Sequence, residues 1–125
     1  MKIIALLLVM SCLWTSCGLG VKRGVPVVIK NGDKVLFESE PISEVRIGTG
    51  SADFIFSTND LKRYEKFMRE GASNGLSVDV YLGDLPYVKN APIVFYSDGI
   101  RTKPIIPLPN DYESKFEEAG FSTIR

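Results

Sequence analysis

The sequence contains no histidine, and its only two cysteines, Cys12 and Cys17, lie within the first seventeen residues. Histidine is the commonest general base and the commonest metal ligand, so its absence removes the usual Ser-His and Cys-His arrangements. The chain after Cys17 can form no internal disulfide, thiol nucleophile or cysteine metal site. We therefore expect a protein that is not an enzyme and that needs neither a metal nor another cofactor.

An excess of charge of one sign is also lacking. Fifteen basic residues balance fifteen acidic ones, and no block of lysine or arginine stands out. Nucleic-acid binding needs clustered cations, so we expect no nucleic-acid partner. Nucleophile-elbow, P-loop, calcium-loop and zinc-ligand spacings are missing as well. The Gly-x-Gly of residues 48–50 precedes a strand pattern rather than a helix, which predicts a hairpin turn and not a phosphate loop.

What the sequence does have is an apolar N-terminal segment behind a single cation. Lys2 is followed by the unbroken apolar run Ile3–Met10, and a short segment then ends at Cys17. A secretory signal has such a positive start and an apolar stretch of about 7–15 residues. The alternatives are a retained transmembrane helix over Ile3–Val21 and a buried core helix. Polar residues and glycines thin the second half of that segment, which favours the signal peptide.

The residues before Cys17 resemble the lipobox of bacterial lipoprotein signal peptides, in which a cysteine receives a diacylglyceryl group. Thr15 and Ser16 stand in the small positions of that motif, whereas Trp14 stands where the family has an aliphatic residue. Cys12 is the alternative modification site. The resemblance covers residues 1–18 only.

This resemblance implies a place and an anchor. Residues 1–17 would be the signal peptide, and Cys17 would carry the lipid that holds the protein in a bacterial cell envelope, at the outer membrane facing the periplasm. Residues 18–24 contain three glycines and are expected to form a flexible tether. Residues 25–125 are enough for a single small domain with one core.

Alternating apolar residues predict two hairpins at the start of this domain. Val27–Lys30 and Lys34–Phe37 flank a turn that contains Gly32, a residue that readily adopts a positive φ. Glu44–Ile47 and Asp53–Ser57 form a second pair of short strands.

A helix is predicted next, over Asp60–Glu70, with Thr58 or Asn59 as its N-cap and Gly71 just beyond its end. Its apolar residues recur at helical spacing and are expected to face the core: Leu61, Tyr64, Phe67 and Met68.

The remaining elements are two strands, a strap and a helix. Leu76–Leu82 alternates strictly, while Ile93–Tyr96 is apolar on both faces, as in a central strand. Lys103–Pro109 contains three prolines and is expected to lie extended over the core. Tyr112–Ala119 predicts a last helix that Gly120 ends. The order ββββ-α-ββ-α predicts an α+β fold with a mainly antiparallel sheet of about six strands and two short helices.

The candidate binding residues are Tyr81, Asp84 and Tyr87. Tyr81 lies on the strand face opposite the expected core residues, and a turn at residues 83–86 separates it from Tyr87. Tyrosine at exposed turns is a frequent interface anchor, and the alternative is that these residues pack in the core. The acidic residues Asp79, Asp84 and Asp98 are expected to serve turns and strand ends rather than a catalytic carboxylate pair.

The expected function is a non-catalytic protein-binding module on a membrane tether. Its partner would be another envelope protein or an effector that it neutralises, as immunity and exclusion lipoproteins of similar size do. The alternative is a structural or accessory lipoprotein of a larger envelope or secretion assembly. Since no motif separates these two, the sequence leaves both open.

Overall fold

A computed structural model describes residues 24–48, 50–97 and 99–125. The predicted signal peptide and both cysteines lie outside these residues, as does the predicted tether apart from Gly24. The elements, in chain order, are β1 (Val27–Asn31), β2 (Lys34–Glu38), β3 (Glu44–Ile47), β4 (Ala52–Phe54), α2 (Thr58–Ser73), β5 (Ser77–Leu82), β6 (Leu85–Pro92), β7 (Val94–Ser97), β8 (Thr102–Ile105), α3 (Tyr112–Ala119) and β9 (Ser122–Ile124).

The predicted α+β class is confirmed, but the strands form three sheets. The largest is antiparallel with the order β2-β1-β5-β6, a second has the order β4-β3-β9, and β7 pairs with β8 alone. β3 and β9 run parallel, whereas the other strand pairs in the described residues are antiparallel. Two helices and a mostly antiparallel arrangement therefore agree with the prediction.

Both predicted hairpins are present. β1 and β2 pair up to Asn31 and Lys34, and Gly32 between them has φ 64°, which suits a tight turn. β3 pairs with β4 through Val45 and Phe54. In both hairpins, the alternation of apolar residues and the residues of the turn predict the same structure.

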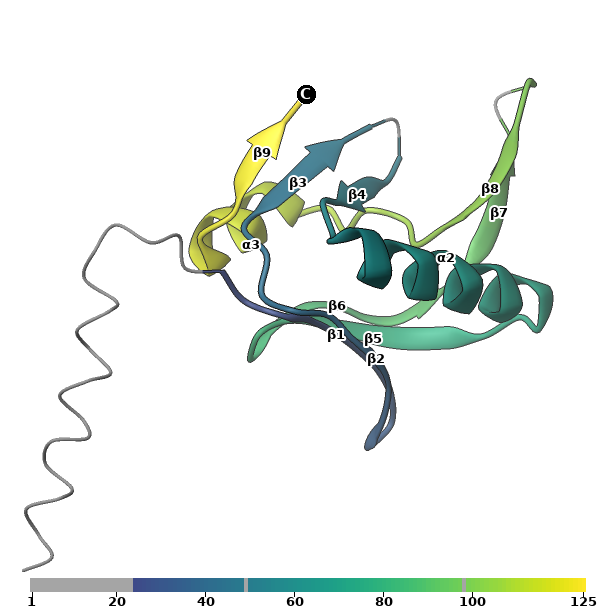
Figure 1. The fold of residues 1–125 in the computed structure, drawn as a ribbon, viewed down its shortest axis with the longest axis horizontal. Coiled ribbons are helices and arrows are strands. Elements are labelled where there is room, and N and C mark those ends of the chain that lie inside the picture. Colours follow the sequence, from purple (N-terminus) through teal and green to yellow (C-terminus); the bar gives the residue numbers. More distant parts are fainter. Residues whose placement is uncertain (1–23, 49, 98) are drawn as a thin grey trace, which may run out of the picture.

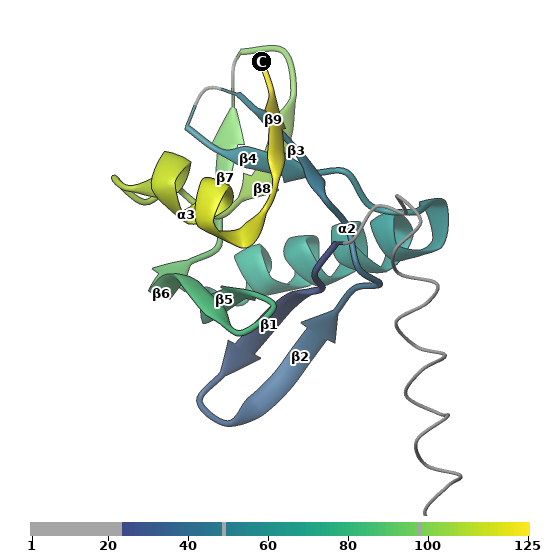
Figure 2. The ribbon, with the colours of Figure 1, turned by 90° about the vertical axis from the view of Figure 1, so that its left-hand side faces the viewer.

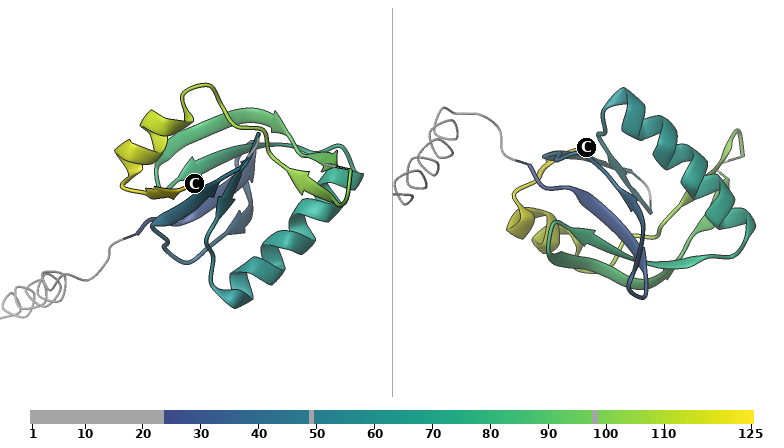
Figure 3. Two further views of the ribbon diagram at one scale, coloured as in Figure 1. Left: turned by 90° about the horizontal axis from the view of Figure 1, so that it is seen from above. Right: turned by 60° about the horizontal axis from the view of Figure 1, so that its bottom comes forward.

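The core lies on one face of the four-stranded sheet. α2, α3 and the β4-β3-β9 sheet all lie on that side, and the two helices lie on either side of the β3–β4 hairpin (Figures 1, 2 and 3). β5 points its even-numbered residues inward, and these are almost fully buried: Val78, Val80 and Leu82. A cluster of rings from Phe54, Tyr87, Phe116 and Phe121 fills the space under α3. Among the described residues, no helix or strand packs on the opposite face of the large sheet (Figures 1 and 2).

The predicted limits of the first helix are wrong at both ends. α2 begins at Thr58, and the hydroxyl of Ser57 accepts the N–H of Asp60 as its N-cap. Gly71 is not the residue that ends the helix. It is buried inside the last turn, where the absence of a side chain lets Leu76 and Ile93 pack closely, and the helix continues to Ser73. Of the predicted stripe, Met68 is buried and Tyr64 and Phe67 pack against the core, but Leu61 is exposed.

Three further expectations differ from the structure. Residues 85–92 form a strand, β6, whereas the sequence placed residues 83–86 in a turn and predicted no strand here. The central strand predicted over Ile93–Tyr96 is wrong, because β7 belongs to a separate two-stranded hairpin and all four of its residues are exposed. Residues 103–105 of the predicted strap form part of β8, although Ile105 and Ile106 do contact the core side as expected.

The last helix was predicted correctly. α3 spans Tyr112–Ala119, and Gly120 follows with φ 86°. The N–H of Phe121 donates to the carbonyl of Phe116, and the two rings lie 5.5 Å apart. In the described part of the chain, no helix is long and apolar enough to cross a membrane.

Candidate functional site

Tyr81 lies on the uncovered face of the large sheet, as predicted. Its neighbours along β5, Val80 and Leu82, point into the core, whereas Tyr81 is partly exposed. The ammonium groups of Lys30 and Lys89 lie 4.9 and 5.5 Å from its ring centroid. Lys89 also donates a hydrogen bond of 3.2 Å to the tyrosine hydroxyl. Tyr81 is thus held between two cations on an open sheet face.

Tyr87 was the second candidate surface tyrosine, with packing in the core as the alternative, and the structure places it in the core. Its side chain is 3% exposed and its ring lies 5.0 Å from that of Phe116. The reason is register, because β5 and β6 join through a two-residue turn that pairs Tyr81 with Pro86. Tyr87 therefore points to the other face of the sheet, and burial raises the pKa of its hydroxyl well above the ordinary 10.0.

Asp84 lies in that turn, next to Gly83 with its φ of 67°. It is exposed, and among the described residues it forms no ion pair. The predicted arrangement of two exposed tyrosines around Asp84 does not exist. Tyr81 and Asp84 are accessible to a partner, but Tyr87 is not at the surface beside them.

The β7–β8 hairpin and its turn carry most of the large hydrophobic side chains that are exposed among the described residues, and the sequence did not predict this. Among the described residues, the large hydrophobic side chains that are exposed include four from this hairpin and its turn: Val94, Phe95, Tyr96 and Ile100. Phe95 is 46% exposed and Ile100 is 87% exposed. The hairpin projects from one end of the domain (Figure 1). The available signal was the adjacent turn around Gly99, which indicates a hairpin and not a central strand.

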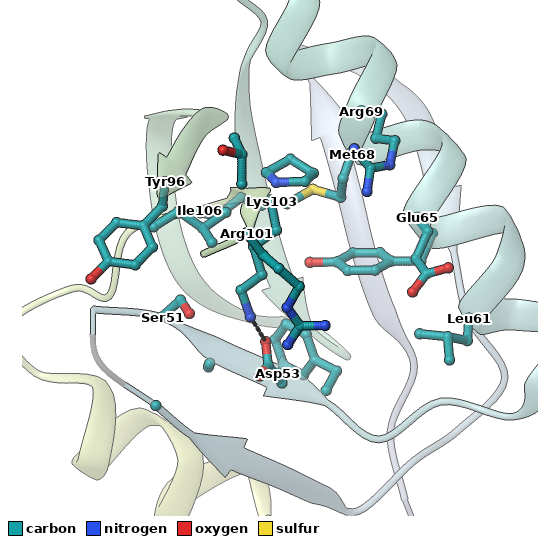
Figure 4. Close-up of a pocket in the computed structure, with 17 residues that line it drawn as sticks. Ser51, Asp53, Leu61, Glu65, Met68, Arg69, Tyr96, Arg101, Lys103 and Ile106 are labelled. Carbon is teal, nitrogen blue, oxygen red and sulfur yellow. Dashed lines mark hydrogen bonds and ion pairs between the residues drawn. The ribbon is translucent and has the colours of Figure 1, made fainter. Parts of the chain in front are cut away.

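A cleft of about 590 Å³ lies beside this hairpin. Its three walls are α2, β4 and β8 with the residues around them (Figure 4). The apolar part of the lining includes four side chains that also belong to the core or pack against it: Ala52, Phe54, Met68 and Ile106. A site of this size matches the clefts in which proteins bind small molecules or short chain segments.

Charged side chains surround the opening of the cleft. Three are basic and two are acidic: Arg69, Arg101, Lys103, Asp53 and Glu65. The ammonium group of Lys103 lies 3.4 Å from the carboxylate of Asp53, and both side chains are about half exposed. In the described residues, neither Arg69 nor Glu65 forms an ion pair. The cleft therefore combines an apolar floor with a rim of slight positive charge.

Tyr64 also lines the cleft, from α2. Burial, and to a lesser degree the Asp53 carboxylate, raise the pKa of Tyr64 well above its ordinary value of 10.0. The hydroxyl stays protonated at neutral pH, so it can donate a hydrogen bond but cannot act as a general base. No group of three or more His, Cys, Asp or Glu residues within the described ranges could hold a metal ion.

No protein-family model matches the chain, and searches of curated proteins and of solved structures likewise found no match.

Proposed function

We propose that this chain is a membrane-tethered lipoprotein of a bacterial cell envelope, and that its domain binds another protein without catalysing a reaction. The tether rests on the resemblance of residues 1–18 to a lipoprotein signal, with acylation at Cys17. The partner is another envelope protein or an incoming effector. The domain supplies the binding surface.

The observation that carries the binding role is the exposed apolar surface of the β7–β8 hairpin. A two-stranded hairpin gains little stability alone, and exposed apolar residues add nothing to the core. Here Val94, Phe95, Tyr96 and Ile100 all remain accessible on one projecting element. Exposed large apolar side chains gathered on one projecting element are typical of protein contact sites. Aromatic side chains such as Phe95 and Tyr96 are also frequent anchors of interfaces.

The experiment that tests this role is capture of the partner by matched variants. The tagged full chain is cross-linked in envelope preparations, and the recovered partner is quantified for Phe95→Ser and for the control Val35→Ser. Val35 is 48% exposed, close to the 46% of Phe95, but it lies on the distant β2. We expect Phe95→Ser to lower recovery at least tenfold and Val35→Ser to leave it unchanged, with both melting temperatures near that of the parent.

Two outcomes contradict the proposal. One is that no partner depends on Phe95, and the other is that both variants lose the same partner equally. Where the proposal holds, the nature of the captured protein separates the two forms of the function. A single soluble partner indicates a neutralising lipoprotein, whereas a membrane assembly indicates an accessory component.

A further inference from the structure

Two sheets present an unpaired edge to the same cleft. Within the part of the chain that the structure describes, β4 is the outer strand of the β4-β3-β9 sheet, and β8 pairs with β7 alone. Residues of both strands line the cleft. The free edge of a strand carries a row of backbone N–H and C=O groups that can pair with another extended chain.

The hydrogen bonds of β3 and β4 show which backbone groups of β4 face this edge. The N–H of Gly48 donates to Ser51 and the N–H of Ile55 donates to Glu44. Because hydrogen-bonded pairs alternate along an antiparallel ladder, Arg46 and Asp53 form the pair between them. Phe54, the next residue along β4, therefore directs its N–H and C=O away from β3 and toward the cleft.

The position of Pro104 shows which backbone groups of β8 face its free edge. It lies opposite Phe95 but has no N–H to donate to β7. The ladder with β7 must therefore use Lys103 and Ile105, the residues on either side. Thr102 and Pro104 then direct their backbone groups to the other edge, so this edge offers the N–H of Thr102 and two carbonyl groups.

The two edges already meet at one end of the cleft. Ser51 and Pro107 form an isolated antiparallel bridge, and the N–H of Leu108 donates to the carbonyl of Gly50 at 3.2 Å. Beyond this junction β4 and β8 separate, with the apolar floor between them and Met68 of α2 beside them (Figure 4). An added strand would continue a pairing that the fold begins itself.

The charges at the opening favour an acidic occupant. Arg69, Arg101 and Lys103 outnumber the two carboxylates there, and Lys103 already neutralises Asp53. That ion pair is half exposed, so it contributes little stability and can rearrange when a ligand enters. Figure 4 shows Arg69 on the helix wall and Arg101 on the β8 side, so cations stand on two sides of the cleft.

We propose that the cleft binds an extended acidic segment of the partner protein by strand addition between β4 and β8. Alternate apolar side chains of that segment enter the floor at Phe54, Met68 and Ile106, and its carboxylates meet Arg69. This inference rests on the proposed protein-binding function, since Tyr96 of the β7–β8 hairpin also lines the cleft. Strand addition takes affinity from main-chain hydrogen bonds and specificity from alternate side-chain pockets.

The test uses two sets of nine-residue peptides and the full chain in detergent. Both sets alternate randomised apolar residues with charged ones, glutamate in the first set and lysine in the second. We expect the purified chain to bind members of the glutamate set at least tenfold more tightly than their lysine counterparts in fluorescence anisotropy. N-methylation of alternate amides in the best binder should lower its affinity at least tenfold, because the methyl groups remove strand hydrogen bonds and keep the side chains.

A matched pair of protein variants locates the site. Arg69→Glu should weaken binding of the best peptide about tenfold, whereas Lys34→Glu, at an exposed lysine of β2 outside the cleft, should not change it. Equal binding of the two sets, tolerance of N-methylation or an equal effect of both charge-reversal variants would each overturn the inference. So would a dimer that Arg69→Glu dissociates, since the occupant would then be a second copy of this chain.

The two proposals fail separately. Loss of partner capture in Phe95→Ser without selective peptide binding leaves the hairpin as the contact surface and rejects strand addition. Absence of any Phe95-dependent partner rejects the proposed function itself.

Discussion

Asp60 is the polar residue on which the junction between β2 and α2 depends. It is 5% exposed, its carboxylate accepts the N–H of Glu40 at 2.8 Å, and Arg63 contacts it at 2.6 Å. The hydrogen bond from Glu40, followed by that from Arg63, lowers the pKa of Asp60 below its ordinary 3.8. The carboxylate of Asp60 therefore stabilises the fold by accepting the backbone N–H of Glu40.

We predict that Asp60→Ala lowers the free energy of unfolding by about 1–3 kcal/mol, because the N–H of Glu40 loses its acceptor. Asp53→Ala, which removes a half-exposed ion pair, should cost less than about 1 kcal/mol. Denaturant unfolding of both variants checks this. Similar losses for Asp53→Ala and Asp60→Ala would mean that the junction does not depend on Asp60.

The lowered pKa of Asp60 also predicts how stability depends on pH. A carboxyl group whose pKa is lower in the folded state contributes its stabilisation fully above the unfolded value, here 3.8. That contribution is lost as the pH falls below this value toward the folded pKa. The difference in stability between the parent and Asp60→Ala should therefore narrow below about pH 4. A constant difference down to pH 2 would contradict the role of the ionised carboxylate.

The candidate site was predictable only in part at this scale. Strict alternation in residues 76–82 placed Tyr81 correctly, because a strand with one buried face leaves the other outward. Tyr87 depended on the length of the next turn. A two-residue turn instead of the expected longer one shifts which residues lie opposite β5, and this moves Tyr87 from the surface to the core.

Glycine was the least informative residue for locating the ends of elements. Gly120 does end α3, and its φ of 86° shows why. Gly71 instead allows a close approach, since a Cβ there would lie 2.7 Å from the side chain of Ile93. Both uses look alike in sequence, so a glycine after an apolar stripe does not decide between a cap and a packing contact.

Among the elements, α3 supplies a side chain that contacts four other rings, as Phe54 of β4 also does. Phe116 is fully buried, and its ring lies within 6.4 Å of four others: Phe54, Tyr87, Tyr112 and Phe121. We predict that Phe116→Ala costs about 3–5 kcal/mol of stability. Phe95→Ala, in the exposed β7, should cost under about 1 kcal/mol. Thermal unfolding distinguishes the two, and a comparable loss at Phe95 would mean that the hairpin packs against the domain more tightly than its exposure indicates.

At the scale of the molecule, local pattern predicted the class of the fold and not the way its sheets assemble. Residues 122–124 pair in parallel with β3, some eighty residues earlier in the chain. β7 and β8 form a sheet of their own although β7 begins with three apolar residues. Such choices depend on which edges remain free after the hairpins form, and no short-range signal encodes them. The cleft results from these non-local choices, which is why its lining could not be predicted.

The attachment of the whole molecule is the last feature open to a direct test. We predict that the mature protein begins at an acylated Cys17 and partitions into the membrane fraction, because residues 1–18 resemble a lipoprotein signal. Cys17→Ser should release the domain or leave an uncleaved precursor, whereas the matched Cys12→Ser should keep the lipid. Intact-mass measurement of the detergent-extracted protein reads the modification directly. An unmodified N-terminus at Met1 would reject the anchor, and loss of the lipid only in Cys12→Ser would assign it to the other cysteine. The β7–β8 hairpin and the cleft belong to the folded domain, so the Cys17→Ser protein should still bind its partner in solution, and a loss of binding there would mean that the anchor takes part in recognition.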